Sequence, residues 1–286
     1  MKHKRLLLFV MLIFLILSCS RKEEWGNLKN LGPNINSSAR DERPTFTGDG
    51  KVMYFSSDRE GVYNIYMSRF ENGEWQPAEK LPSPINTSGH DYDAFITRNG
   101  KTLYFVSNRE GGEKYWDCAI FVSHLENGKW SKPVKLDKEL DVPGLPDWGP
   151  SLTEDESLLF FSSGRKPAKK EQVQIWMVKK QNGKWGNPEF LPEPVNSGGW
   201  EAEPMITPDG KTIYFNSDRG DSTVNIWSVD FVNGKWMNPK MLPGPFYSTA
   251  HDYSPSPHPD GKHFYFASNR PGGFGSTDLY VVEKIK

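Results

Sequence analysis

The chain consists of short segments in which apolar and polar residues alternate, with turn residues between them. In one stretch these segments cover Glu203–Thr207, Lys211–Ser217, Asn225–Phe231 and Lys235–Leu242, and similar groups of four recur along the chain. A period of two is typical of β-strands with one buried face, and no sustained helical period interrupts it. The pattern therefore predicts an all-β protein built from short strands.

Tight turns separate these strands. Pro208-Asp209-Gly210-Lys211 and its relatives lie between the first and second strand of a unit, and Asn-Gly pairs such as Asn182-Gly183 precede the last strand. Gly and Asn readily adopt the positive φ angles that two-residue hairpins require. Consecutive strands are therefore expected to pair antiparallel.

A Trp residue marks each unit and shows that the unit is repeated. Successive Trp residues are 50, 55, 55 and 51 positions apart. A unit of this length with four antiparallel strands is typical of a β-propeller blade. Four of these Trp residues follow the same Asn-Gly turn, which predicts a structural role. The five are Trp25, Trp75, Trp130, Trp185 and Trp236.

The two ends of the chain complement each other. The last unit stops after three strands, at Val282, whereas Trp25–Ser37 aligns without a gap on the fourth strand and following loop of another unit, Trp185–Ser197. Pairing the first strand with the last unit closes the ring and leaves no open edge there. The expected fold is a five-bladed β-propeller of four-stranded antiparallel blades over residues 25–286, closed by the N-terminal strand.

The first 18 residues have the composition of a secretory signal peptide. Basic residues precede an apolar run, Leu6–Leu17, which is short for a bilayer span. Cys19 follows Ile16-Leu17-Ser18 and resembles the lipidated Cys of a bacterial lipobox. We expect cleavage before Cys19, with residues 19–24 as a lipidated tether; an uncleaved membrane anchor is the alternative.

The tether also carries a short charged motif. Lys22-Glu23-Glu24 resembles the signal that sends some Bacteroidetes lipoproteins to the cell surface, and a plain solvated tether is the alternative. The expected location is the outer membrane or cell surface, with the protein held by its lipid.

The net charge and the cysteine content limit the classes of partner and the covalent cross-links that we expect. Loss of residues 1–18 removes three of the 35 basic residues, which leaves 32 against 36 acidic residues and a formal charge of −4. This balance argues against a nucleic-acid partner. Only Cys118 remains beside Cys19, so we expect no disulfide within the propeller and interpret Cys118 as a small buried side chain.

Two longer motifs indicate a family. Pro208-Asp209-Gly210-Lys211-Thr212-Ile213-Tyr214-Phe215 and the segment Ser268–Tyr280, which contains Gly272-Gly273-Phe274-Gly275, resemble the TolB-type, WD-like propeller repeats of bacterial periplasmic and surface proteins. The resemblance covers essentially the whole mature chain. It implies an extracytoplasmic propeller, in a family that includes protein-docking propellers, enzyme-associated propellers and lipoproteins.

The two faces of such a disc differ. Short Asp-Gly and Asn-Gly turns gather on one face, whereas the longer and more varied loops gather on the other, which we call the long-loop face. Loops on a rigid scaffold commonly carry the function, so we expect any site there.

An acid before the first strand and an Arg after the second recur in every unit on this face. A carboxylate ring that binds a cation or acts as acid and base is one interpretation; structural ion pairs that lock neighbouring loops are the other, and fivefold repetition favours them. The acids are Asp41, Asp91, Asp147, Glu201 and Asp252, and the Arg residues are Arg59, Arg109, Arg165, Arg219 and Arg270.

Departures from the repeat are the candidates for function. Two positions after the recurring acid the units have Arg43, Asp93, Gly149, Glu203 and Ser254, so Asp93 and Glu203 are additional carboxylates. If the protein is an enzyme, these two are the expected catalytic pair, since glycoside hydrolysis uses two carboxylates. Solvated surface carboxylates are the alternative.

Aromatic residues on the same loops are the candidate ligand-binding set. Rings with a polar edge suit stacking on sugars or anchoring a protein partner, and packing between blades is the alternative. The set is Tyr92, Trp148, Trp200, Tyr253 and Trp116.

Two histidines are the candidates for a metal site, and they indicate one only weakly. His90 and His251 occupy equivalent positions in the second and fifth units, so a metal would join them only across the channel, and no cofactor is expected.

We expect a lipid-anchored binding or scaffold module for an envelope protein or polysaccharide, without chemistry of its own. A carbohydrate-active hydrolase or lyase at the channel mouth is the alternative.

Overall fold

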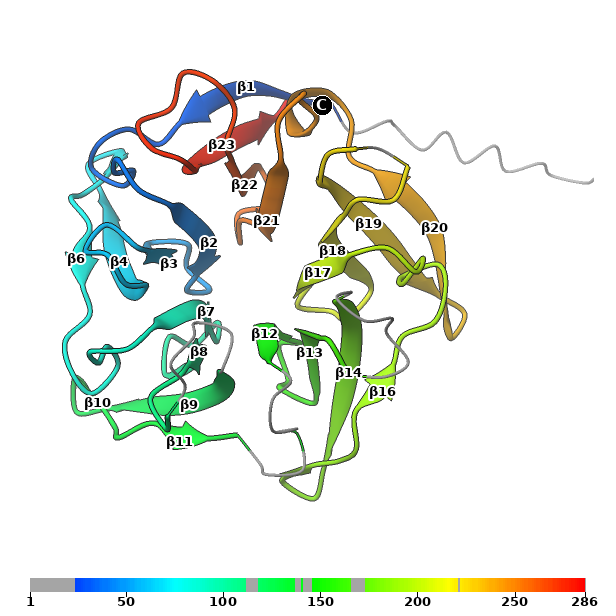
Figure 1. The fold of residues 1–286 in the computed structure, drawn as a ribbon, viewed down its shortest axis with the longest axis horizontal. Coiled ribbons are helices and arrows are strands. Elements are labelled where there is room, and N and C mark those ends of the chain that lie inside the picture. The colour runs from blue at the N-terminus through cyan, green and yellow to red at the C-terminus, as the bar shows by residue number, and fades with distance from the viewer. Residues whose placement is uncertain are drawn as a thin grey trace, which may run out of the picture.

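Five β-sheets surround a central axis in a flat disc (Figure 1). The computed structural model describes residues 24–111, 118–136, 140, 146–165, 173–220 and 222–285. Each sheet is antiparallel and its strands are ordered from the axis to the rim, so the predicted five-bladed propeller is confirmed. Within these ranges no helix has the length and apolar character needed to cross a membrane.

Each blade takes its inner three strands from consecutive segments of the chain. Blade 1 has β2 (Asp41–Phe46), β3 (Val52–Ser57), β4 (Asn64–Glu71), β5 (Glu74–Trp75) and β6 (Glu79–Lys80). Blade 2 has β7 (Asp91–Ile96), β8 (Thr102–Ser107), β9 (Ala119–Glu126), β10 (Lys129–Trp130) and β11 (Val134–Lys135). Blade 3 has β12 (Asp147–Leu152), β13 (Leu158–Ser163), β14 (Gln174–Gln181), β15 (Lys184–Trp185) and β16 (Glu189–Phe190).

The last two blades complete the ring. Blade 4 has β17 (Glu201–Ile206), β18 (Thr212–Ser217), β19 (Asn225–Val232) and β20 (Lys235–Met241). A short 3₁₀ helix, Gly244–Phe246, follows it. Blade 5 has β21 (Asp252–Pro257), β22 (His263–Ser268), β23 (Asp278–Lys284) and, from the other end of the chain, β1 (Trp25–Asn30).

The predicted outer strand is divided in the first three blades. Its two short pieces pair with the same third strand, and each interruption contains a proline, which cannot donate a backbone hydrogen bond. In blade 4 the strand β20 continues through a register shift, where Asn238 has a φ of 58°. The turns before these strands have the predicted geometry: Asn182 and Gly183 have φ angles of 52° and 78°.

The N-terminal strand closes the ring as predicted. Trp25 pairs with Lys284 and Asn30 with Tyr280, in antiparallel register. The side chain of Asn36, which follows β1, donates to the Leu279 carbonyl at 3.0 Å and accepts from the Leu279 N–H at 2.8 Å. Both ends of the chain therefore contribute to the hydrogen bonding of blade 5.

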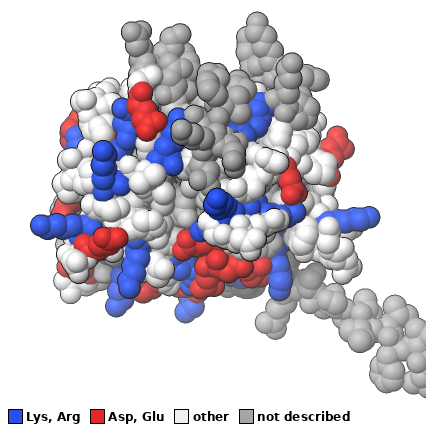
Figure 2. Space-filling model, turned by 90° about the horizontal axis from the view of Figure 1, so that it is seen from below, with Lys and Arg blue, Asp and Glu red and all other residues white. Residues whose placement is uncertain are grey.

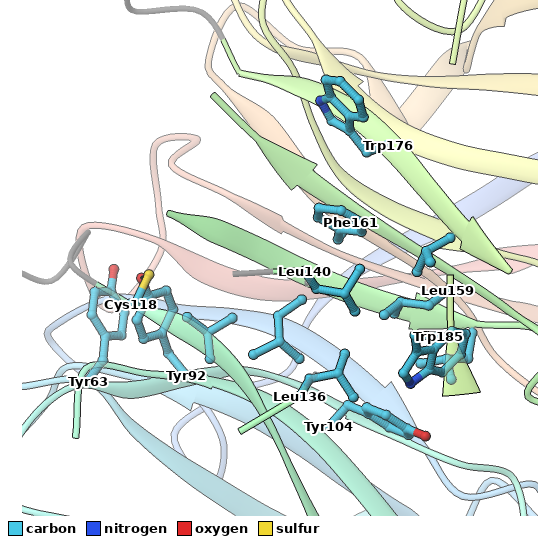
Figure 3. Close-up of a cluster of buried hydrophobic side chains, with 14 residues drawn as sticks. Tyr63, Tyr92, Tyr104, Cys118, Leu136, Leu140, Leu159, Phe161, Trp176 and Trp185 are labelled. Atoms are coloured by element: carbon cyan, nitrogen blue, oxygen red, sulfur yellow. The ribbon is translucent and has the colours of Figure 1, made fainter. Parts of the chain in front are cut away.

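The recurring Trp residues lie between neighbouring blades. Trp75 donates its indole N–H to the hydroxyl of Tyr265 in blade 5 at 3.3 Å, and Trp236 meets Phe160 of blade 3 edge to face. Figure 3 shows the layer between blades 2 and 3, where Trp185 lies beside Tyr104. The structural role predicted for these residues is confirmed, because each blade buries its apolar face against the next.

Ring closure predicts a specific loss of stability. Trp25 contacts Phe246 and Phe264 edge to face, with ring centroids 5.6 and 5.9 Å apart, whereas Leu28 on the same strand is 41% exposed. Trp25→Ala should lower the melting temperature by several degrees, and deletion of residues 25–32 should lower it further. Leu28→Ala is the control and should melt like the wild type. Equal melts for the wild type and the deletion would contradict closure by β1.

Candidate functional site

The recurring acids and arginines form one ion pair in each blade. Arg59 contacts Asp41 at 2.6 Å and Arg109 contacts Asp91 at 2.7 Å. Arg219 contacts Glu201 at 3.2 Å, and the pairs in blades 3 and 5 are alike. Each acid is buried. The interpretation of this ring as structural pairs, rather than a free carboxylate ring, is confirmed.

Each of these guanidinium groups is held by further contacts of the same kind. Arg109 donates from Nε to Ser107 Oγ at 2.8 Å and from Nη1 to the Pro84 carbonyl at 3.0 Å. Its guanidinium lies 4.9 Å from the ring centre of Phe105 and 5.1 Å from that of Phe121. Such cation–π and charge-assisted contacts join the loop that enters the blade to the loop between its second and third strands.

The position two residues after each acid forms a second ring, and its backbone is unusual. The innermost strand of every blade shifts register there. All five residues have a positive φ, which costs energy for residues other than glycine. They are Arg43 (57°), Asp93 (50°), Gly149 (58°), Glu203 (52°) and Ser254 (52°).

This bulge turns the backbone amide toward the preceding blade. Asp93 N–H donates to Ser56 Oγ at 2.9 Å, and Glu203 N–H donates to Ser162 Oγ at 2.8 Å. Bulges commonly redirect a side chain next to a functional site. Here they bring four unlike side chains and the backbone of Gly149 together around the channel.

Asp93 is bound within this ring. It is 5% exposed, its Oδ1 lies 3.9 Å from Arg43 Nε, and its Oδ2 accepts the Gly149 N–H at 3.0 Å. A Cβ on Gly149 would lie 3.0 Å from Arg43 Nη2, so this close approach requires glycine. Burial raises the pKa of Asp93 to about 7, although Arg43 lowers it, and the charge of Glu203 adds to the increase. Asp93 thus has an Arg partner that the repeat pattern does not provide.

Glu203 and Glu42 face a pocket. Glu203 Oε2 accepts from Asn216 Nδ2 at 2.8 Å and from Ser254 Oγ at 2.7 Å. Glu42 is half-buried, and burial followed by the nearby charge of Glu203 raises its pKa to about 8; a hydrogen bond with Tyr63 opposes the shift. Glu42 is therefore largely protonated at neutral pH and can donate a hydrogen bond or a proton.

The pocket lies on the long-loop face between blades 4, 5 and 1. Its volume is about 480 Å³, within the range of sites for small molecules. Glu42 and Glu203 lie in it, and Trp200 and Tyr253 contribute aromatic surface. The remaining lining residues are Arg40, Asn216, Val224, His251, Asn269, Ser276 and Thr277.

The predicted aromatic set divides into two groups. Trp200, which is 50% exposed, and Tyr253 line the pocket. Tyr92 is buried, and its hydroxyl accepts from Trp148 Nε1 at 3.1 Å and contacts Cys118 Sγ at 3.2 Å. Tyr92 and Trp148 therefore pack between blades 2 and 3, and Figure 3 shows Tyr92 in this layer.

Cys118 is a buried side chain, as expected. It lies at the inner end of the layer between blades 2 and 3, beside Tyr63 and Tyr92 (Figure 3). Burial raises the pKa of its thiol to about 12, which makes the reactive thiolate scarce at neutral pH.

The two candidate histidines have matching structural contacts. His90 Nδ1 accepts the Tyr63 N–H at 3.2 Å, and His251 Nδ1 accepts the Val224 N–H at 3.0 Å. Neither belongs to a group of three potential metal ligands in the described part of the chain. Two other residues singled out in the sequence, Trp116 and the expected lipidation site Cys19, lie outside the described residues.

Sequence reasoning missed Glu42, Arg40 and Asn216 as site residues. Glu42 stands at a position where three blades have Tyr or Trp and one has Ala. A carboxylate at a position that is uncharged in the other blades could have identified Glu42 as a site residue. The sequence does not identify Arg40 and Asn216 in the same way. They reach the pocket only because blades 4 and 1 lie on either side of blade 5.

Charge on the rim of the disc is mixed. Figure 2 shows Lys and Arg side chains interspersed with Asp and Glu on the side in view, with acidic groups gathered near one edge. No broad basic stripe crosses the described atoms on that side.

Comparisons with known proteins support the fold. No family model matches the chain, and no curated protein matches by sequence. TolB from Acinetobacter baumannii is similar in structure, with 18% identity and a TM-score of 0.54 over 88% of this chain; the chain spans 56% of the length of that protein.

Two enzymes also have a similar fold. The α-L-arabinofuranosidase PaAbf62A from Podospora anserina, solved with cellotriose, matches with 14% identity and a TM-score of 0.60 over 92% of this chain and 97% of its own. The catalytic domain of the GH62 α-L-arabinofuranosidase from Coprinopsis cinerea has 12% identity and a TM-score of 0.59 over the same shares. At these identities the likeness establishes the fold alone, which is TolB-like.

The raised pKa of Glu42 predicts a pH dependence of stability. Between the ordinary pKa of 4.5 and about 8, the folded state holds a proton that the unfolded chain releases. The free energy of unfolding should therefore fall as pH rises through this window, and Asp93 should act in the same direction. Glu42→Gln should flatten the fall in melting temperature between about pH 5 and 8. Glu71→Gln, at an exposed position, should follow the wild type; parallel curves for Glu42→Gln and the wild type would contradict the assignment.

Proposed function

We propose that this protein is a binding module that recognises a glycan through the pocket between blades 4, 5 and 1. The observation that carries the proposal is the convergence of Trp200, Tyr253, Glu42 and Glu203 on one pocket of about 480 Å³. Each departs from the fivefold pattern or occupies a position that varies among blades. The repeat does not explain this combination.

Trp200 supports a sugar or similarly flat, polar ligand. Half of its surface is exposed, although a large aromatic side chain gains free energy from burial. An exposed indole beside polar groups is suited to stacking on the apolar face of a sugar ring. Its backbone N–H donates to Asp218 Oδ1 at 2.9 Å, which fixes the loop that carries it.

The polar groups of the pocket are held in place before a ligand arrives. Asn216 donates to Glu203 and accepts the Ser254 N–H at 3.0 Å, and Asn269 accepts the His251 N–H at 2.9 Å. Tyr253 shares a hydrogen bond of 2.6 Å with Thr277. Fixed donors and acceptors reduce the entropy lost on binding and favour hydroxyl-rich ligands.

The proposed cellular setting follows from the N-terminal sequence. A signal peptide over residues 1–18 and a lipid on Cys19 would place the propeller outside the cytoplasm, at the outer membrane or cell surface. The long-loop face would then meet envelope or extracellular polysaccharides. An envelope protein is the other class of partner, and its binding in place of a glycan would contradict the proposal.

Binding depends on the exposed indole. In a screen of immobilised polysaccharides and oligosaccharides followed by calorimetry, Trp200→Ala should weaken binding about tenfold or more, and Trp200→Phe should retain most of the affinity. Phe274→Ala is a matched control, because Phe274 is 52% exposed and lies outside the pocket. Equal affinities for Trp200→Ala and the control would contradict the proposed site.

A specific observation favours a second function, a carbohydrate-active hydrolase or lyase. Glu42 has a pKa of about 8 and shares the pocket with Glu203, so one carboxyl is available as an acid beside another. Glycoside hydrolysis uses such a pair. The sequence predicted Asp93 with Glu203, but Asp93 is bound to Arg43 and Gly149 and does not line the pocket.

Turnover separates the two functions. If the protein is an enzyme, it should release reducing sugar or unsaturated product from the glycan it binds. Glu203→Gln should then lower kcat at least about a hundredfold with little change in binding. Asp93→Asn should lower it much less. A protein that binds the glycan and releases no product, at neutral and mildly acidic pH, is not this enzyme.

A further inference from the structure

One turn on the opposite face of the disc departs from the repeat at two positions. In the other four blades, the turn after the first strand begins with Thr, whose Oγ1 bonds to the Asp or Asn two residues later, as between Thr207 and Asp209 at 2.7 Å. Blade 5 has His258 in place of this Thr and keeps the acceptor, as Asp260. It also has His263 at the first position of the next strand, where the other blades have Val, Thr or Leu.

The two histidines converge on the same carboxylate. Asp260 Oδ1 lies 3.1 Å from His258 Nδ1, and Asp260 Oδ2 lies 2.6 Å from His263 Nδ1. Potential ligand atoms from all three side chains lie within 4.8 Å of one another. A zinc ion about 2.0–2.2 Å from each ligand requires ligand atoms roughly 3–4 Å apart, so the contact between Asp260 and His263 must widen and the side chains must adjust around the ion.

The orientation of His258 is fixed by a backbone carbonyl of blade 1. His258 Nε2 lies 3.1 Å from the Gly50 oxygen, which can only accept, so Nε2 donates there and Nδ1 is the ring atom on the side of Asp260, whose backbone N–H lies 3.4 Å away. A metal-bound histidine commonly donates its other N–H to a carbonyl in this way. The approach is close: a Cβ on Gly50 would lie 2.5 Å from the His258 ring.

Asp260 is also fixed and available as an anionic ligand. Its Oδ1 accepts the Lys262 N–H at 2.8 Å and the His263 N–H at 3.0 Å. These two amide bonds hold the carboxylate in place beside both imidazoles.

The cluster opens onto its own pocket. A cavity of about 430 Å³ between blades 5 and 1 is lined by all three side chains, and Glu74 and Trp75 lie in the same wall. This space leaves room for water or a further ligand at the remaining coordination positions. Structural zinc sites usually have four protein ligands, whereas a site with three keeps an open position.

We propose that His258, Asp260 and His263 bind a divalent transition-metal ion, of which Zn²⁺ is the best match. Two imidazoles and one carboxylate favour Zn²⁺ and related ions over Mg²⁺ and Ca²⁺, which prefer oxygen ligands. On binding, the ion replaces the hydrogen bond between His263 and Asp260, and the proton on His263 Nδ1 leaves for Nε2 or for solvent.

An ion bound at this cluster would stabilise the junction between blades 5 and 1. His258 meets Phe46 of blade 1 edge to face, with ring centroids 4.8 Å apart, and its N–H reaches Gly50. An ion on blade 5 would therefore hold the side chain that bridges to blade 1, at the junction where the ring closes. A ligand that binds only the folded state raises its stability.

The test measures metal binding by the purified protein after treatment with a chelator. Titration with ZnCl₂ at pH 7.5 should show one ion per chain and an increase in melting temperature, and CoCl₂ should give visible absorption bands. MgCl₂ and CaCl₂ should give neither response. His263→Ala and Asp260→Asn should lower the Zn²⁺ affinity at least about tenfold. The His263 side chain is 38% exposed, so its variant should remain folded.

A matched control removes another histidine. His124 is exposed on blade 2, and His124→Ala should bind Zn²⁺ like the wild type. Gly50→Ala should weaken binding, because its Cβ displaces the His258 ring. Absence of stoichiometric Zn²⁺ binding by the wild type would overturn the proposal, as would equal affinities for His263→Ala and His124→Ala. Loss of the site would leave the glycan pocket on the other face untouched.

Discussion

The structure depends on burying each blade against the next around a closed ring. No blade covers both of its apolar faces alone, and the fifth is completed only when β1, from the start of the chain, pairs with β23. The recurring Trp residues and the five acid–Arg pairs reinforce this arrangement, the first between blades and the second between loops within a blade. The scaffold uses the repeated residues for stability, and function is left to the positions that break the repeat.

The fold could be predicted from the sequence because its causes are local and repeated. Hairpin turns, alternating strands and the regular Trp residues each specify one step of the same pattern, and the ends of the chain show how it closes. The structural role of the acid–Arg ring followed from repetition alone. The division of the outer strands was not predicted. The repeat pattern shows where each outer strand lies but not where its backbone pairing is interrupted.

The candidate site was predicted only in part. Trp200, Tyr253 and Glu203 lie in the pocket, whereas Tyr92 and Trp148 pack between blades 2 and 3 and Asp93 pairs with Arg43. These outcomes depend on the bulge with positive φ, which turns side chains toward different neighbours, and on the approach of Arg43 to Gly149 across the channel. The histidines near Asp260 were missed because the alternating pattern does not show where the strand ends; it ends at Pro257, and His258 begins the turn.

Two pockets between blades thus contain residues that depart from the fivefold repeat. On the long-loop face, blades 4, 5 and 1 surround carboxylates and an exposed indole; on the opposite face, blades 5 and 1 enclose two histidines and an aspartate. The central claim is that the first of these is a sugar site, and a crystal structure with a bound oligosaccharide tests it most directly. We expect a sugar ring on Trp200 with hydroxyls toward Glu42 and Glu203. A ligand bound elsewhere on the disc, with this pocket filled only by solvent, would contradict the account.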